Sequence, residues 1–391
     1  MKNDKEVVAT EDVAPVNPER RNFMKKTGAL AAAGALSTLA PAFVKDVRSS
    51  SGSLVLYSWS DYIYQDMIDA FTAKTGIKVV LATYGSNDEV LNKLRASKGS
   101  GFDIVMPSVT YGKQWYKHGD LLQPLDESKI NVAGCDPVMY EASIDLGAVH
   151  RRKRYLVPFN WGTEAITFKT DVVGGTDQPS YGDLWKSEYI GNVACRAHSS
   201  LIGIGLYLDA IGKVPSNRML ATYENEKEMR RVYTECTDFA IKHKKSLRQF
   251  WSNAQETTNA FMQNGCVIGQ TWDGPANRMF QESKGKIKYM APKEGALTWM
   301  DSMGIPAGAE NLEQAYAWIN WYYSPENGAM HANASGYNSC AKDAAKHLKP
   351  EMKKFFTMAY PNGAKDLWWY PVEPTWFVSI RNEFRDKFLA A

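Results

Sequence analysis

The stretch Leu-Val-Leu-Tyr-Ser-Trp-Ser-Asp-Tyr at residues 54–62 opens the folded part of the chain and indicates its fold class. Its first half is a short apolar run, which is typical of a strand buried on both faces. Its second half precedes a helical segment and contains Trp59, Ser60, Asp61 and Tyr62. Because α/β folds place ligands at the carboxyl ends of their strands, we expect these side chains at a binding site.

Two aromatic rings beside a carboxylate suit a cation. Aromatic faces attract a cation through their quadrupole, and a carboxylate neutralises a desolvated ammonium. A structural role fits the same residues, in which Trp59 and Tyr62 close a core and Asp61 caps the following helix. The stretch alone leaves both interpretations open.

Length and composition indicate a large folded protein without a nucleic-acid partner. The chain has 391 residues, of which 44% are hydrophobic, and this size favours two lobes. Its formal net charge of +3 is close to neutral, and the basic run at residues 151–154 is isolated and fits a solvated loop. The chain also has 12 Trp and 20 Tyr, which are favoured where apolar contact is combined with a polar group.

The N-terminal residues 1–42 resemble a twin-arginine export signal. Residues 20–25 read Arg-Arg-Asn-Phe-Met-Lys, and an Ala/Gly/Leu run follows at residues 27–39, although Glu19 departs from the usual small hydroxyl residue. The alternative is a membrane anchor, but this run is too weakly apolar for one. We therefore expect export by the twin-arginine machinery, cleavage near Ala42 and a soluble protein outside the cytoplasm.

No pattern in the sequence indicates a cofactor, a metal site or a catalytic residue. The chain lacks a nucleophile elbow, an HExxH motif, a P-loop and a dinucleotide glycine motif, which argues against a periplasmic enzyme. Its five cysteines have no metal-ligand spacing. Cys195 and Cys266 lie in apolar runs that look like neighbouring strands, so a disulfide between them is possible in an oxidising compartment.

Strands and helices alternate from residue 54 onwards. The spacing predicts a helix over residues 64–75 ending at Gly76, a strand over 77–84, a helix opened by a capping box at 86–89, and a strand over 102–107. This βαβαβ order predicts a mainly parallel sheet.

The chain then crosses to a second lobe and returns. A crossing segment at residues 156–161 and a return near 299–306 predict lobe 1 at residues 53–158 plus about 300–335, and lobe 2 at residues 159–299 plus about 336–391. Clefts between hinged lobes are common ligand sites.

Seven motifs in register resemble the periplasmic substrate-binding proteins of polyamine ABC importers. They lie at residues 57–62, 75–79, 84–89, 101–108, 123–126, 292–296 and 299–301. The resemblance implies an α/β two-lobe periplasmic-binding-protein fold of type II, in which each lobe is a mainly parallel sheet flanked by helices. It also implies a periplasmic monomer that binds putrescine, spermidine or a similar small organic cation in the interlobe cleft and delivers it to the permease subunits.

The resemblance also implies which residues bind the ligand. Trp59 and Tyr62 would sandwich its aliphatic part, Asp61 would take an amine, and Trp272 would close over it from the second lobe. The other implied positions are Ser60, Ser108, Ser252, Trp299, Asp301 and Tyr337, with Asp273 beside Trp272 as a second carboxylate.

Residues 195–200, Cys-Arg-Ala-His-Ser-Ser, depart from the family pattern, which has acidic residues here. If Arg196 faces the cleft, it repels a second ammonium and favours a carboxylate, so the ligand would be zwitterionic or singly charged, such as an amino-acid derivative or a betaine-like cation. Alternatively, Arg196 points to solvent or pairs with Glu224 or Glu226, and His198 is a helix cap. Compensating carboxylates for a diamine are present in Asp273, Glu164 and Glu373.

The segment 366–376 contains three Trp, one Tyr and two Pro. It could line the cleft or anchor a terminal helix over residues 377–388. Packing is the favoured interpretation, because an exposed aromatic cluster of this size would otherwise be an interaction patch.

Overall fold

The computed structural model describes residues 52–117, 121–174 and 177–391. The predicted export signal at residues 1–42 lies outside these residues.

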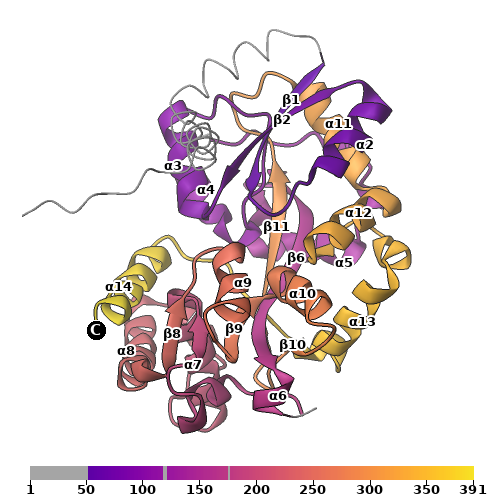
Figure 1. The fold of residues 1–391 in the computed structure, drawn as a ribbon. Coiled ribbons are helices and arrows are strands. Elements are labelled where there is room, and N and C mark those ends of the chain that lie inside the picture. Colours follow the sequence, from indigo (N-terminus) through magenta and orange to yellow (C-terminus); the bar gives the residue numbers. More distant parts are fainter. Residues whose placement is uncertain (1–51, 118–120, 175–176) are drawn as a thin grey trace, which may run out of the picture. The chain divides into compact units, whose positions relative to one another are not determined.

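One sheet contains two groups of parallel strands joined by two long antiparallel strands (Figure 1). The first group consists of β1 (Ser53–Trp59), β2 (Lys78–Tyr84) and β3 (Ile104–Val105). The second group consists of β7 (Val193–Cys195), β8 (Leu247–Phe250) and β9 (Ile268–Trp272). Between them lie β6 (Leu156–Lys169) and β11 (Ala296–Gly304), which pair antiparallel with each other.

The long strands explain how one sheet serves both groups. β11 pairs with β3 at one end, and β6 pairs with β9 further along. β6 crosses the predicted lobe boundary near residue 158, and β11 crosses the one near residue 299. The division into two lobes at these residues stays a prediction. The remaining strands are β4 (Val149–His150), β5 (Lys153–Arg154), β10 (Ile287–Met290), β12 (Asn338–Ser339) and β13 (Leu367–Trp369).

Helices flank both groups of strands (Figure 1). Near the first group are α2 (Gln65–Thr75), α3 (Asn87–Ser97), α4 (Gly112–Lys117), α5 (Pro137–Ser143), α11 (Leu312–Tyr322) and α12 (Pro325–Ser335). Near the second group are α6 (Thr170–Val173), α7 (Ala197–Ala210), α8 (Glu226–Lys242), α9 (Ala254–Met262), α10 (Asp273–Glu282), α13 (Pro350–Ala359) and α14 (Phe377–Ala390). No helix in the described ranges has both the length and the apolar character that a bilayer crossing requires.

Local sequence signals set several helix ends. Gly76 ends α2 in the left-handed conformation at φ +73°, which a residue without Cβ adopts without strain. Ser86 Oγ accepts a hydrogen bond from Glu89 N, as predicted for a capping box, but Glu89 Oε2 accepts from Gly85 N. Tyr64 is the N-cap of α2, so the interpretation of Asp61 as a helix cap is wrong.

The apolar face of α8 belongs to the hydrophobic core beside the second group of strands. That face carries Met229, Val232, Tyr233, Cys236 and Ala240, which the helical period places on one side. α8 contacts α7 and α14, and the terminal helix thereby becomes part of the same core.

All five cysteines are buried free thiols. The possible Cys195–Cys266 disulfide is therefore not formed in this structure. Burial raises the pKa of the Cys195 thiol to about 12, which keeps it protonated and unreactive.

Candidate functional site

A pocket of about 590 Å³ lies at the carboxyl ends of both groups of parallel strands. Trp59 ends β1, Ser108 follows β3, Arg196 follows β7, and Trp272 ends β9. The long strand β11 contributes Trp299 and Asp301 from its interior. The pocket therefore occupies the crevice in which α/β sheets place ligands.

Most of the predicted site residues line this pocket. They are Trp59, Asp61, Tyr62, Ser108, Glu164, Arg196, His198, Ser252, Trp272, Trp299, Asp301, Tyr337 and Glu373. Ser60 and Asp273 do not line it. Ser60 is exposed in the turn after β1, while Asp273 is buried beneath the pocket.

The hydrogen bonds of Asp273 explain its position. Trp272 ends β9, and Asp273 is the first residue of α10. Asp273 Oδ2 accepts hydrogen bonds from Thr163 N at 3.1 Å and from Tyr360 Oη at 3.1 Å. Asp273 therefore stabilises the packing of β6 and is not a second carboxylate of the pocket.

Four aromatic rings form one wall of the pocket. The rings of Tyr62 and Trp299 stack with centroids 6.3 Å apart, and Tyr337 meets them edge-on at 5.5 and 5.3 Å. Trp59 lies beside Tyr62 at 6.2 Å and is fixed by a 2.9 Å hydrogen bond from its Nε1 to Met106 O. This wall offers flat apolar faces to an alkyl chain and electron-rich faces to a cation.

Two carboxylates lie against this aromatic wall, and each is bound by a tyrosine hydroxyl. Tyr337 Oη donates to Asp61 Oδ2 at 2.8 Å, and Tyr62 Oη donates to Asp301 Oδ2. Asp301 Oδ1 is buried and has no hydrogen-bond partner in the described chain. Neither carboxylate forms an ion pair with another described residue, and Asp301 Oδ1 remains an acceptor without a donor.

Burial disfavours the charged form of both carboxylates. It raises the pKa of Asp61, although the Tyr337 hydrogen bond and Arg278 oppose the shift. It also raises the pKa of Asp301 to about 7, against the effect of the Ser108 and Tyr62 hydroxyls. A bound cation would stabilise the ionised form, so the aromatic wall with these two carboxylates is electrostatically complementary to an ammonium.

Two serines of the pocket are held by neighbouring side chains. Asn87 Nδ2 donates to Ser108 Oγ at 2.9 Å, and Ser108 N donates back to Asn87 Oδ1 at 3.0 Å. Ser252 N and Oγ both donate to Glu256 Oε2, at 2.7 and 2.8 Å. The Ser108 hydroxyl acts on the neighbouring Asp301 carboxyl, whereas the Ser252 hydroxyl is used by Glu256.

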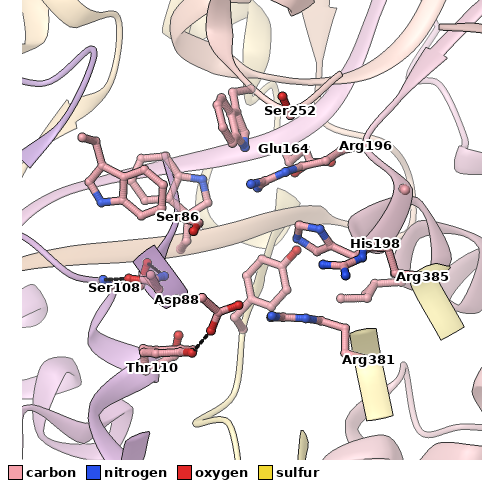
Figure 2. Close-up of a pocket in the computed structure, with 18 of the residues that line it drawn as sticks. Ser86, Asp88, Ser108, Thr110, Glu164, Arg196, His198, Ser252, Arg381 and Arg385 are labelled. Atoms are coloured by element: carbon pink, nitrogen blue, oxygen red, sulfur yellow. Dashed lines mark hydrogen bonds between the residues drawn. The ribbon is translucent and has the colours of Figure 1, made fainter. Parts of the chain in front are cut away.

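Arg196 faces the pocket from the start of α7 (Figure 2). Its guanidinium carbon lies 4.7 Å from the ring centroid of Trp272 and 5.7 Å from that of Trp251. No ion pair joins Arg196 to Glu224 or Glu226, so the alternative that Arg196 pairs with one of them is wrong.

His198 is not the cap of α7, since Arg196 occupies the N-cap position. Burial lowers the pKa of His198 well below its usual value, which makes the imidazole neutral.

Glu164 lies buried behind Arg196. Its Oε1 accepts hydrogen bonds from Ser199 Oγ at 2.5 Å and Gln270 Nε2 at 2.8 Å. Burial raises the pKa of Glu164, and the charge of Arg196 opposes that shift. The carboxylate is thus fixed by core donors and makes no ion pair with the guanidinium.

The terminal helix α14 adds two cations that the sequence analysis missed. Arg381 and Arg385 line the pocket from α14 (Figure 2). Arg381 Nη1 binds Glu373 Oε1 at 3.1 Å, and Tyr370 lines the pocket beside them. Trp368, in contrast, is buried in the core. The segment 366–376 therefore both lines the cleft and anchors the terminal helix. No motif marks these arginines, because only packing on α7 and α8 brings them to the site.

No cluster of three or more His, Cys, Asp or Glu side chains in the described part of the chain is arranged to hold a metal ion.

Two parallel strand groups, two connecting strands and a pocket at the strand ends define the two-lobe fold of periplasmic binding proteins. Residues 66–358 match the family of bacterial extracellular solute-binding proteins, and the chain belongs to that family. This confirms the resemblance inferred from the seven motifs.

Known relatives cover most of the chain. It is 31% identical over 334 residues to the spermidine/putrescine-binding periplasmic protein of Escherichia coli, covering 85% of this chain and 89% of that protein. It is 31% identical over 319 residues to the putrescine-binding periplasmic protein of Pseudomonas aeruginosa, covering 78% and 81%. The spermidine/putrescine substrate-binding protein of Streptococcus pneumoniae, a solved structure, matches with a TM-score of 0.68 and 28% identity over 87% of this chain and 98% of that one.

Proposed function

We propose that this protein captures a small ammonium-bearing solute outside the cytoplasm and delivers it to the permease subunits of an ABC importer. The relatives named above bind spermidine or putrescine, and the pocket provides the flat rings and carboxylates that an alkyl-ammonium ligand needs. The protein binds its ligand and performs no reaction on it.

The observation that carries this proposal is the buried, unpaired carboxylate oxygen of Asp301. Its Oδ1 is buried without a hydrogen-bond partner in the described chain, beside the stacked rings of Tyr62 and Trp299. A buried polar atom of this kind costs free energy until a donor reaches it. An ammonium in the aromatic wall supplies both the donor and the opposite charge.

Ligand capture couples the two groups of strands. Trp59 and Asp61 follow β1 in the first group, and Trp272 ends β9 in the second. A ligand that contacts both groups binds a closed arrangement better than an open one, and this difference in affinity shifts the equilibrium toward closure. The closed surface would then dock on the permease.

Substitution Asp301→Asn tests the proposal. It removes the charge but retains the shape, so calorimetry should show that affinity for the bound ammonium compound falls by about 100-fold or more. The variant should fold, because the raised pKa means that ionised Asp301 destabilises the apo protein at pH 8, while a neutral amide does not. Unchanged affinity would refute the placement of the ammonium.

Asp273→Asn is the matched control. It makes the same chemical change at another buried carboxylate that does not line the pocket, and it should leave the ligand affinity unchanged. Mass spectrometry of the released ligand completes the test, because recovery of a converted product would contradict a purely binding role.

Export by the twin-arginine route is part of the proposal. Two observations support this route. Residues 20–25 contain the arginine pair and are followed by an Ala/Gly/Leu segment, and the relatives from Escherichia coli and Pseudomonas aeruginosa named above are periplasmic proteins.

A further inference from the structure

Arg196 is a cation without a partner inside the pocket. Its guanidinium forms no hydrogen bond and no ion pair with any other described residue, although it is half-buried against Trp251 and Trp272. A guanidinium carries five donors in a planar fork that matches a carboxylate. These donors are directed into the same pocket that holds Asp61 and Asp301.

The other two arginines of the pocket differ in this respect. Arg381 is bound to Glu373, and Arg385 is bound to Asp386 by its Nη2 at 2.7 Å. Their charges are therefore compensated by carboxylates of the protein. Among the described residues that line the pocket, Arg196 is the arginine that forms no ion pair with a carboxylate of the protein.

The start of α7 adds to the positive potential around Arg196. Ala197 and His198, the first two residues of this 14-residue helix, line the pocket. The first turn of α7 contains no acidic residue, and the N-cap side chain makes no capping hydrogen bond. A helix N-terminus in this state favours an anion, and neutral His198 adds a potential N–H donor.

We propose that the ligand is a zwitterion, with its ammonium held by Asp61 and Asp301 in the aromatic wall and its carboxylate held by Arg196. Tyr337 lines the same pocket and its hydroxyl fixes Asp61 by a 2.8 Å hydrogen bond. The inference rests on the proposed function and specifies its ligand class as an amino carboxylate.

A diamine fits this arrangement poorly. If one ammonium occupies the aromatic wall, the other approaches Arg196, and like charges that face each other in a partly desolvated pocket repel. The charge of Glu164 acts on Arg196 and offsets part of this repulsion, but Glu164 forms no ion pair with the guanidinium and its Oε1 is held by Ser199 and Gln270. A carboxylate at the same position instead forms charge-assisted hydrogen bonds.

Calorimetry of the full chain with three matched pairs of compounds tests the inference. The pairs are putrescine with 4-aminobutanoate, cadaverine with 5-aminopentanoate, and choline with glycine betaine. In at least one pair the zwitterion should bind ~10-fold or more tightly than its cationic partner. Tighter binding of the cation in every pair would overturn the zwitterion and leave the proposed function intact. Failure of all six compounds to bind would overturn both.

Arg196→Gln locates the carboxylate. The variant should bind the preferred zwitterion ~10-fold or more weakly and the matched cation at least as well as the unmodified protein. Arg230→Gln is the control, since this arginine lies outside the pocket and is paired with Glu383, and its affinities should be unchanged. Equal affinity of Arg196→Gln for the zwitterion would overturn the inference. If the variant fails to fold, calorimetry of the unmodified protein with the three matched pairs of compounds still tests the inference.

Discussion

Asp301 sets the pH range in which the pocket can hold a cation. The titratable groups around it are Tyr62, Tyr84, Cys340 and Asp61. Burial raises the pKa of the two tyrosines and the cysteine well above their usual values, so these three remain neutral at physiological pH. Asp61 is the other acid, and its pKa is also raised by burial.

Affinity for an ammonium ligand should therefore fall as the pH falls through about 7. Below that value Asp301 is protonated in the apo protein, and binding must first remove the proton, which weakens binding up to about tenfold per pH unit for one group. Aliphatic ammonium groups stay charged over this range, and His198 stays neutral because burial lowers its pKa.

Calorimetry from pH 5.5 to 8.5 with one ligand measures this dependence. The profile should be flat in the Asp301→Asn variant, apart from the contribution of Asp61. A flat profile in the unmodified protein would mean that no carboxylate titrates on binding.

At the scale of single elements, Gly162 on β6 makes room for the aromatic wall. It pairs with Trp299 of β11, and a Cβ on Gly162 would lie 2.4 Å from Trp299 Cζ2 and 2.8 Å from Asp273 Oδ1. Both distances are too short for van der Waals contact. The absence of a side chain in β6 therefore allows the Trp299 indole to lie across the strand and face the pocket.

Gly162→Ala should displace the Trp299 ring. We expect a loss of about 1–3 kcal/mol in the free energy of unfolding from overpacking, together with weaker ligand binding. Chemical denaturation and calorimetry measure the two effects. Gly85→Ala is the control, since its Cβ would meet Glu89 Oε2 at an ordinary 3.7 Å. Unchanged binding by Gly162→Ala would show that Trp299 does not contact the ligand.

Local elements were largely predictable from the sequence. The ends of α2 and α3 follow from Gly76 and Ser86, because a left-handed cap and a side-chain cap involve residues a few positions apart. The strand predicted over residues 102–107 shortens to Ile104–Val105. Its length depends on pairing with β1 and β11, which local patterns do not contain.

At the scale of the whole molecule, the export route makes a further prediction. Replacing Arg20 and Arg21 together by Lys should leave the protein in the cytoplasm, because the twin-arginine machinery reads the arginine pair. Fractionation of cells that express the two forms measures this. Periplasmic recovery of the Lys-Lys form at the level of the unmodified protein would contradict the proposed route, and ligand binding by the purified form should be unaffected.

The sequence by itself determined the alternation of strands and helices after residue 54, the caps at Gly76 and Ser86, and the family, together with the aromatic and acidic residues of one side of the pocket. These features rest on short-range patterns and on motifs that stay in register along the chain. Only the tertiary structure decided that Asp273 points away from the pocket, that Arg196 points into it without a partner, and that α14 brings Arg381 and Arg385 beside it. The physical reason is that the direction and pairing of a charged side chain depend on groups far away in the sequence, which come together only when both groups of strands and the terminal helix pack.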